Sequence, residues 1–332
     1  MKKLSLSAIL AIGIIGAFPL TASAQDSDFY AWASNFRTQA FNAGVSAATI
    51  NENFRDLEYI PDVIYKDRNQ PEFKLGLEDY KRRIVTPQRI AAGREKIAEN
   101  KSTLDAIEQK YGVPKSIIVA LWGIETNFGK STGGYHVLSA LATLAYEGRR
   151  NEYFSKEFIA TLLLADKHPY ISQPVMGSWA GALGQCQFMP STYLKFAVDG
   201  NNNGKVDLWN EKPDVLASAA NYLSQSGWKA GAPYAETVTL AQNIEESQMG
   251  LNVTKTIAEW QKMGVRFTAA NNLPTDMPAS LIQPNGSDKK YLIFNNYRAV
   301  LTWNRSHNFA LTVGELANKI AATQKSHQPS NS

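Results

Sequence analysis

The sequence predicts a mainly helical protein with a small β-rich part near its C-terminal end. Apolar residues recur at helical spacing through most of residues 28–231, beginning with Phe29, Trp32 and Phe36. From 236 to 294 the pattern changes to short apolar runs separated by Asn-, Pro- and Gly-rich turns, which is typical of strands. With 44% hydrophobic and 19% charged residues, the composition is that of a globular protein and excludes disorder for most of the chain.

The first 24 residues are typical of a signal peptide. Lys2 and Lys3 precede an apolar run from Ala8 to Leu20 that is too short to span a bilayer, and Ala22-Ser23-Ala24 offers a small-residue cleavage site. We expect cleavage before Gln25 and export of the protein. A lipoprotein needs a cysteine at that point, and no later apolar run approaches membrane-spanning length, so the sequence predicts no stable membrane anchor.

Residues 25–110 are expected to form a helical region. Gln70-Pro71 breaks its pattern, and 73–84 then reads as a further helix. Thr86 as N-cap with Pro87 in the first helical position predicts the start of another.

The rest of the chain divides into four predicted parts. Residues 111–232 are helical with conspicuous loops, and their clearest helices are expected at 116–126, 155–165 and 215–225. Residues 233–295 form the small β-rich domain, with strands expected at 236–240, 264–268, 281–282 and 291–294. A C-terminal helical segment at 296–324 and a flexible polar tail at 325–332 complete the chain.

Several kinds of site are excluded. The single cysteine, Cys186, allows neither an intramolecular disulfide nor a cysteine-rich metal site. The four histidines are too scattered for a zinc motif, and Ser178 lacks the GxSxG spacing of a nucleophile elbow. A formal charge of +4, lower still without Lys2 and Lys3, gives no case for nucleic acid.

Glu125 is the strongest catalytic candidate that the residues themselves provide. In the predicted helix 116–126 it lies one turn beyond Leu121, on the apolar face that includes Ile117. Burial disfavours the charged form of a carboxylate, so the pKa of Glu125 should rise toward the range useful for a general acid. The alternative is a structural glutamate that is hydrogen-bonded to Thr126, Asn127 or nearby backbone.

The loop from Gly177 to Pro190 is a second candidate. It concentrates glycines, amides and aromatic side chains, which let a polymer approach the backbone, bind hydroxyl and acetamido groups, and stack on sugar rings. The alternative is a glycine-rich segment that only packs helices together.

Several motifs in this region resemble those of the lytic murein transglycosylase B family, also called soluble lytic transglycosylase B. They occur in the family order and extend over nearly all of the chain after the signal peptide. They are Tyr111-Gly-Val-Pro114, Gly123-Ile-Glu-Thr-Asn-Phe-Gly129, Gly184-Gln-Cys-Gln-Phe-Met-Pro-Ser191, Leu208-Trp209, Ala220-Asn-Tyr-Leu223 and Trp303-Asn-Arg-Ser306.

The resemblance implies a lysozyme-like helical catalytic core at 111–232, beside the N-terminal helical region and the small β-rich domain. It also implies a soluble periplasmic enzyme, a lyase that acts on peptidoglycan glycan strands, with other cell-wall enzymes as further partners. The enzyme would cleave the β-1,4 bond between N-acetylmuramic acid and N-acetylglucosamine and leave 1,6-anhydromuramic ends. Glu125 would be the sole acid/base, and catalysis would need no cofactor. The absence of a second carboxylate motif agrees with assistance by the substrate's acetamido group.

The family's cleft residues match further positions. Ser178 corresponds to a serine that hydrogen-bonds the catalytic glutamate, and Gln187 to a glutamine that lines the cleft. Trp303 and Phe309 replace tyrosines, so they keep a stacking surface but lose a hydroxyl. The full set of implied substrate-binding residues is Tyr80, Ser178, Gln187, Tyr222, Trp303, Asn304 and Phe309.

The stretch 199–214 resembles an EF-hand loop. Oxygen ligands at alternate positions, Asp199, Asn201 and Asn203, would converge on one cation together with the Lys205 carbonyl. Asparagine stands where the last EF-hand ligand is expected, and the family resemblance assigns that role to Asp214 after a one-residue insertion. We expect a weak structural site for Ca²⁺ or Na⁺; a simple Asn/Gly turn is the alternative.

Two other functions remain open at this point. A hydrolytic muramidase would use the same substrate with water as the nucleophile, and its products would carry ordinary reducing ends. A non-catalytic peptidoglycan-binding protein would bind sacculi without dissolving them.

Overall fold

The computed structural model describes residues 24–69, 75–171 and 173–322. The predicted signal peptide as far as Ser23, the Gln70-Pro71 break and the predicted tail lie outside these residues. None of the described helices has the length and apolar character needed to cross a membrane.

The expected mainly helical fold is confirmed. The first helices are α1 (Ala24–Asn42), α2 (Ala47–Arg55), α3 (Pro61–Arg68), α4 (Leu77–Ile84), α5 (Pro87–Glu99), α6 (Lys101–Tyr111) and α7 (Lys115–Thr126). They are followed by α8 (Val137–Glu147), α9 (Asn151–Lys167), α10 (Pro190–Phe196), α11 (Lys212–Gln225), α12 (Ile257–Lys262), α13 (Asn295–Trp303) and α14 (His307–Ala321).

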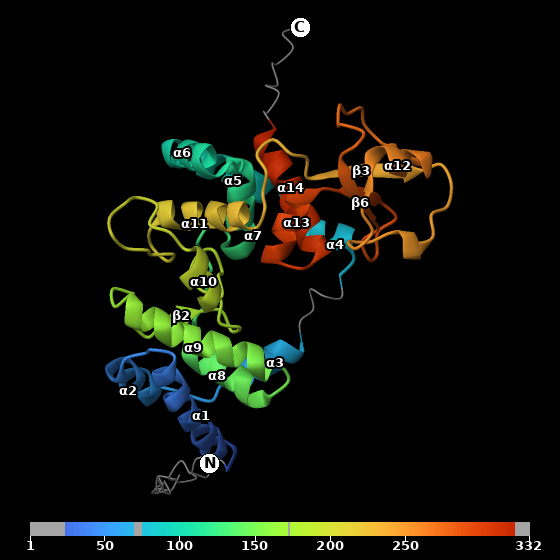
Figure 1. Cartoon of the computed structure of the whole chain (residues 1–332). Helices are drawn as coiled ribbons and strands as arrows, with labels where there is room; N and C mark the ends of the chain where they lie inside the picture. Colours follow the sequence, from blue (N-terminus) through green and yellow to red (C-terminus); the bar gives the residue numbers. More distant parts are fainter. Residues whose placement is uncertain (1–23, 70–74, 172, 323–332) are drawn as a thin grey trace, which may run out of the picture.

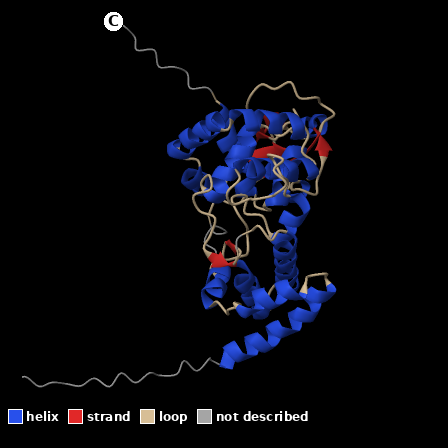
Figure 2. Cartoon of the chain, turned by 90° about the vertical axis from the view of Figure 1, so that its left-hand side faces the viewer, coloured by secondary structure: helices blue, strands red, loops and turns tan. Residues whose placement is uncertain are grey.

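The helices form two groups (Figure 1). One group contains α1, α2, α3, α8 and α9, and the other contains α5, α6, α7, α11, α13 and α14. The strands within residues 235–293 lie beside α13 and α14, whereas α10 and the strand β2 (Met176–Gly177) lie between the groups. Figure 2 shows that many of the loops run through the region between the two groups of helices. The segment around residues 176–190 therefore connects them.

Local sequence signals explain where the catalytic candidate's helix and its neighbour begin and end. The Thr86 side chain accepts the N–H of Arg89 and Pro87 opens α5, as predicted. The helix α7 ends at Thr126 because Asn127 and Phe128 take positive φ angles of 51° and 60°. The Phe128 ring then folds back to within 2.7 Å of where a Cβ on Gly123 would be, so this turn requires glycine at 123.

The C-terminal helical segment differs from the continuous pattern read at 296–324. It consists of two helices, because Asn304 is extended and its Oδ1 accepts the N–H of Ser306 (3.0 Å). The Ser306 hydroxyl then accepts the N–H of Phe309 (3.3 Å) and caps α14. This break leaves Trp303 at the end of α13.

The strands form two sheets. A two-stranded ribbon pairs β1 (Tyr135–His136) with β2, and a five-stranded antiparallel sheet has the order β4-β6-β7-β3-β5. Four of these strands match predicted ones. The bounds in the larger sheet are β3 (Ala235–Leu240), β4 (Lys255–Thr256), β5 (Val265–Phe267), β6 (Pro278–Ile282) and β7 (Lys290–Ile293).

The larger sheet separates two hydrophobic clusters. Ile282, Tyr291 and Ile293 belong to the main core with the helices. Leu281 and Leu292, one residue away on the same strands, pack with Trp260 of α12 in a second cluster. The alternation follows from the two-residue period of a strand, which points successive side chains to opposite faces.

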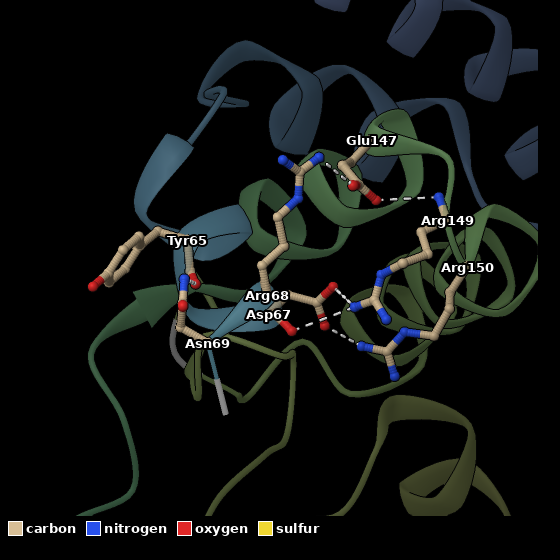
Figure 3. Close-up of polar contacts among 7 residues, drawn as sticks. All are labelled: Tyr65, Asp67, Arg68, Asn69, Glu147, Arg149 and Arg150. Carbon is tan, nitrogen blue, oxygen red and sulfur yellow. Dashed lines mark hydrogen bonds and ion pairs between the residues drawn. The ribbon is translucent and has the colours of Figure 1, made fainter. Parts of the chain in front are cut away.

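An ion-pair cluster joins α3 to the turn between α8 and α9 (Figure 3). The Asp67 carboxylate, whose side chain is 3% exposed, pairs with the guanidinium groups of Arg149 and Arg150. Arg68 pairs with Glu147 beside it (2.7 Å). The cluster holds the end of α3 against α8 and α9.

Candidate active site

Glu125 lies half-buried in the last turn of α7, as the apolar helix face predicted. Beside its carboxyl group is a cavity of about 10 Å³, close to the size of one water molecule. The cavity walls are mainly apolar: Ile118, Leu121, Trp122, Gln185, Cys186, Val215, Leu216, Ala219 and Trp303. Burial raises the pKa of Glu125 from 4.5 to about 7, and a hydrogen bond from Trp303 opposes the rise. The carboxyl group is therefore suited to give and regain a proton near neutral pH.

Trp303 is the hydrogen-bond partner of Glu125. Its Nε1 donates to Oε1 of Glu125 over 2.8 Å. The loss of a tyrosine hydroxyl at this position therefore does not remove the hydrogen-bond donor, because the indole N–H supplies one. The indole ring packs against Phe188 and Tyr222, with centroid separations of 5.1 and 5.0 Å.

Tyr222 supports the same arrangement from α11. Its hydroxyl donates to the carbonyl of Thr302 over 2.7 Å, directly before Trp303. Its ring also contacts Phe196, with a centroid separation of 4.8 Å. The structure thus brings together Glu125, Trp303 and Tyr222, three of the predicted site residues.

Gln185 joins α7 to the segment 208–209, and the sequence predicted no individual role for it. Its Oε1 accepts the indole N–H of Trp122 (2.8 Å), and its Nε2 donates to the carbonyl of Trp209 (2.6 Å). Its backbone carbonyl accepts the Thr126 hydroxyl (3.0 Å), and its backbone N–H donates to Leu208 (2.7 Å). The sequence carries no local signal for these bonds, because Trp122 and Trp209 are distant from Gln185 in the chain and meet it only in the folded structure.

The loop that follows is held in a tight conformation. Leu183 and Phe188 exchange backbone hydrogen bonds of 2.7 and 3.2 Å, and Gln187 between them has a positive φ of 52°. The Gln187 amide donates to the carbonyls of Thr132 (3.2 Å) and Gly184 (3.0 Å). The loop is thereby fixed to the segment that follows α7.

The Ser178 hydroxyl is engaged within its own loop. It accepts the backbone N–H groups of Ala180 (3.3 Å) and Ala182 (2.9 Å). The Glu125 carboxylate instead accepts a hydrogen bond from Nε1 of Trp303. A bond from Ser178 to Glu125 therefore stays a prediction.

Three further predicted residues lie in different settings. Asn304 is exposed at the end of α13, where its Oδ1 accepts the N–H of Ser306. Tyr80 is half-buried on α4, near Arg89, and its place in a cleft stays a prediction. Phe309 corrects the expectation of a stacking surface, because it is 3% exposed and packed in the main core. Its helical spacing with Val313 and Leu316 was a signal of that burial.

Cys186 lies beneath Glu125 and is 2% exposed. Its thiol donates to the carbonyl of Val215 over 3.1 Å. Burial raises the pKa of the Cys186 thiol, with a further contribution from Glu125. It is a core residue of the site and presents no reactive surface to a ligand.

In the loop at 199–214, the side-chain oxygen atoms of the loop accept hydrogen bonds from its own backbone N–H groups. The Asp199 carboxylate accepts the N–H groups of Asn203 (3.2 Å) and Gly204 (2.7 Å). The Asp214 carboxylate, from the first turn of α11, accepts those of Gly200 (2.8 Å) and Asp207 (2.8 Å). Asp214 is fully buried, and burial raises its pKa. A buried carboxylate facing this loop fits a cation.

The amides between these aspartates follow the same pattern. Asn201 Oδ1 accepts the N–H of Asn203 (3.1 Å), and Asn203 Oδ1 accepts that of Lys205 (2.9 Å). Within the described residues no cluster of three or more His, Cys, Asp or Glu side chains could hold a metal ion. The donor set here would be two carboxylates, two amides and a carbonyl, which suits a hard cation bound weakly.

Comparisons with known proteins agree with this site. The chain matches the family model described as Transglycosylase SLT domain over residues 28–318. Membrane-bound lytic murein transglycosylase B of Escherichia coli (strain K12) is 32% identical over 247 residues, which are 73% of this chain and 66% of that protein. The matched stretch thus spans about two thirds of the E. coli protein's length.

Two solved structures are also similar. SltB3 from Pseudomonas aeruginosa, in complex with NAG-anhNAM-pentapeptide, has a TM-score of 0.81 and 38% identity, covering 88% of this chain and 79% of that one. The E. coli lytic transglycosylase Slt35 in complex with calcium has a TM-score of 0.77 and 28% identity, covering 90% and 94%. The lysozyme-like helical fold is that of these enzymes. Because the family model covers most of the chain, this protein belongs to the lytic murein transglycosylase family with the SLT domain.

Proposed function

We propose that this protein cleaves the β-1,4 bond between N-acetylmuramic acid and N-acetylglucosamine in peptidoglycan, with Glu125 as the single acid/base. The observation that carries the proposal is the Glu125 carboxyl group at the end of α7, whose pKa burial raises to about 7. Among the described residues, Trp303 donates a hydrogen bond to this carboxyl group and Cys186 is an electrostatic neighbour. Neither is the second carboxylate of a two-carboxylate glycosidase.

In the proposed reaction, neutral Glu125 protonates the glycosidic oxygen as the bond to C1 of the muramic acid breaks. The acetamido group of the same sugar stabilises the positive charge that develops at C1. The ionised Glu125 then takes the proton of the C6 hydroxyl, whose oxygen bonds to C1. The carboxyl group ends as it began, and no water is consumed. The complex of SltB3 with NAG-anhNAM-pentapeptide supports the anhydro product.

The product distinguishes this reaction from hydrolysis. Digestion of purified sacculi followed by mass spectrometry should give muropeptides that are one water lighter than hydrolytic products. Glu125→Gln should lower the rate by at least about a hundredfold while the folded structure is retained. Reducing ends on the products would replace this reaction with a muramidase activity, and unchanged digestion by the variant would contradict the role of Glu125.

We propose that the glycan strand follows the residues gathered around Glu125. Tyr222 and Trp303 would contact sugar rings, and Gln187 and Asn304 would bind their polar substituents. Tyr80 and Ser178 are kept as cleft residues on the family resemblance. Alanine variants at these positions should raise the KM for sacculi while the variant proteins stay folded.

We also propose that Asp199, Asn201, Asn203, the Lys205 carbonyl and Asp214 hold a structural Ca²⁺ or Na⁺ ion. The calcium complex of Slt35 supports this, as do the oxygen atoms that line the loop. The ion would neutralise two carboxylates and stabilise the loop that leads into α11. Millimolar CaCl₂ should raise the Tm of the wild type, and Asp214→Asn should remove that shift. An equal shift in both proteins would exclude this site.

Finally, we propose that the protein acts in the periplasm after removal of residues 1–24, where other cell-wall enzymes would be its partners. The basic, apolar and small-residue parts of that segment support export. N-terminal sequencing of the protein from a periplasmic fraction should begin at Gln25. Intact Met1 in that fraction would contradict the cleavage.

A further inference from the structure

Two aromatic rings pack against the indole of Trp303, and its N–H points at Oε1 of Glu125. Phe188 and Tyr222 contact the indole with interplanar angles of 60° and 72°. The Tyr222 hydroxyl fixes the adjacent backbone at Thr302, and α13 ends at Trp303 itself. The indole N–H therefore has little freedom to choose another acceptor than Oε1 of Glu125, 2.8 Å away.

The chemistry of this donor differs from that of a hydroxyl. An indole N–H donates only, whereas a tyrosine hydroxyl both donates and accepts. In a neutral carboxyl group the carbonyl oxygen is the stronger acceptor, whereas the hydroxyl oxygen is a donor that keeps only weaker acceptor capacity. The hydrogen bond from Nε1 of Trp303 to Oε1 therefore favours the form of neutral Glu125 in which Oε1 is the carbonyl oxygen and Oε2 carries the proton.

We propose that Trp303 is a positioning residue that determines which oxygen of Glu125 carries the transferable proton. Oε1 remains an acceptor throughout the reaction, and Oε2 gives the proton to the glycosidic oxygen and later receives one from the C6 hydroxyl. The inference rests on the proposed acid/base role of Glu125. The proton lost from Oε2 in the first step is replaced in the second, so the cycle balances without another acid or base.

The other described groups near Glu125 do not compete with Trp303 as hydrogen-bond donors to its carboxylate. The helices packed against α7 are α5, α6, α11 and α14, and the loop at 184–190 adds the neutral Cys186 thiol. Several charged groups on those helices have other partners: Arg94 with backbone carbonyls of α14, Asp105 with Lys101 and Lys115, Asp214 with backbone N–H groups, and Glu315 with Lys81 and Lys319. The causes of the raised pKa of Glu125 are its burial and, in opposition, the hydrogen bond from Trp303.

A variant that removes only the donor tests the proposal. Replacing Trp303 with 3-benzothienylalanine keeps the bicyclic ring but puts sulfur in place of the N–H. A hydrogen bond to the charged form favours ionisation, so its loss should raise the pKa of Glu125 by about one unit. The alkaline limb of the pH–rate profile should move up by the same amount, while kcat at the optimum falls and KM stays nearly constant.

Two spectroscopic readouts do not depend on activity. A ¹³C-carboxyl titration should show the higher pKa of Glu125 directly. At low pH, the infrared C=O stretch of neutral Glu125, assigned by its loss in Glu125→Gln, should move to higher frequency in the benzothienylalanine variant. That upshift is expected only if Oε1 is the carbonyl oxygen of the neutral acid.

Trp303→Phe and Trp303→Tyr complete the series. Phenylalanine should reproduce the shifts, and tyrosine should restore the pKa in part because its hydroxyl can donate. If phenylalanine prevents folding, the benzothienylalanine variant decides. An unchanged C=O frequency and an unchanged alkaline limb would overturn the proposal and leave Trp303 as a stacking surface. Anhydro products from the wild type would in that case leave the proposed function intact.

Discussion

Nε1 of Trp303 and Oε1 of Glu125 lie 2.8 Å apart, although the two residues are 178 positions apart in the sequence. The contact joins the end of α7 to the end of α13, so residues from the central helices and from the segment after the β-rich part meet at one carboxyl group. Within the described part of the chain, it is the one hydrogen bond that this carboxylate accepts. The pKa of Glu125 should therefore depend on the position of the end of α13 as well as on that of α7.

The activity of the wild type should decline with increasing pH around neutrality. Burial raises the pKa of Glu125 to about 7, and the first step requires the neutral form. Well above that pH, each further unit should lower the rate about tenfold as the neutral fraction falls. Initial rates of sacculus clearance between pH 5 and 9 measure this limb. A limb below pH 5 would show that Glu125 is not desolvated as described.

The Glu125→Gln variant should be more stable than the wild type in alkaline solution. Burial raises the pKa of Glu125 in the folded state above its ordinary value of 4.5. Below pH 4.5 Glu125 is neutral in both the folded and the unfolded state and does not affect the free energy of unfolding. As the pH rises through about 7, the buried group must ionise, and the folded wild type loses stability. The loss in the free energy of unfolding between these two pH values is about 3 kcal/mol. Urea unfolding of both proteins at pH 4.5 and 8.5 measures it. Glu95→Gln, at an exposed position, serves as the control and should show no such pH-dependent gain.

Gln185→Ala should destabilise the protein and slow catalysis. The change leaves the Trp122 indole N–H and the Trp209 carbonyl without their partner and opens space beside α7. We expect a loss of about 2–4 kcal/mol in the free energy of unfolding. Gln225→Ala, at an exposed position on α11, is the matched control and should change it by less than about 0.5 kcal/mol. Equal effects of the two substitutions would refute the role assigned to Gln185.

Cys186 should be unreactive in the folded protein. It is 2% exposed, and burial raises the pKa of its thiol, so little thiolate is present at pH 8. Iodoacetamide should leave the native protein unmodified and add one group per chain in urea, as measured by intact mass. Cys186→Ser keeps a donor for the Val215 carbonyl and should retain activity within about threefold. Rapid native alkylation would show that the site opens.

Asp67→Asn should weaken the attachment of α3 to α8 and α9. It removes the negative charge that Arg149 and Arg150 share, at a side chain that is 3% exposed. Because both guanidinium groups reach solvent, we expect a loss of about 1–3 kcal/mol in the free energy of unfolding. Asp79→Asn breaks the exposed pair with Arg82 and should cost at most about 1 kcal/mol. Denaturant unfolding of the two variants compares a buried with an exposed carboxylate.

The features predictable from sequence were those whose signals are local. Glu125 on an apolar helix face, the N-cap at Thr86 and the four strands read from short apolar runs each depend on residues within a few positions of one another. The break before α14 had a local signal too, since Ser306 is a good N-cap residue. It was hidden because apolar residues continue on both sides.

The contacts that complete the site could not be read in this way. Trp303 was expected to offer a stacking surface without the tyrosine hydroxyl, but its indole N–H donates a hydrogen bond to Glu125 because α13 ends there. Phe309 was expected in the cleft, yet in the first turn of α14 its ring is buried in the main core. Both outcomes depend on how helices distant in sequence are placed.

The five-stranded sheet acts as a partition within the molecule. A substitution at Leu292 meets Trp260 and the second cluster, whereas one at Tyr291 meets the main core and Lys81. Adjacent positions on β7 therefore belong to two separately packed clusters. A change of side-chain volume on the face toward α12 should disturb the second cluster first, whereas the same change on the other face should disturb the core that also contains Leu121 of the helix carrying Glu125.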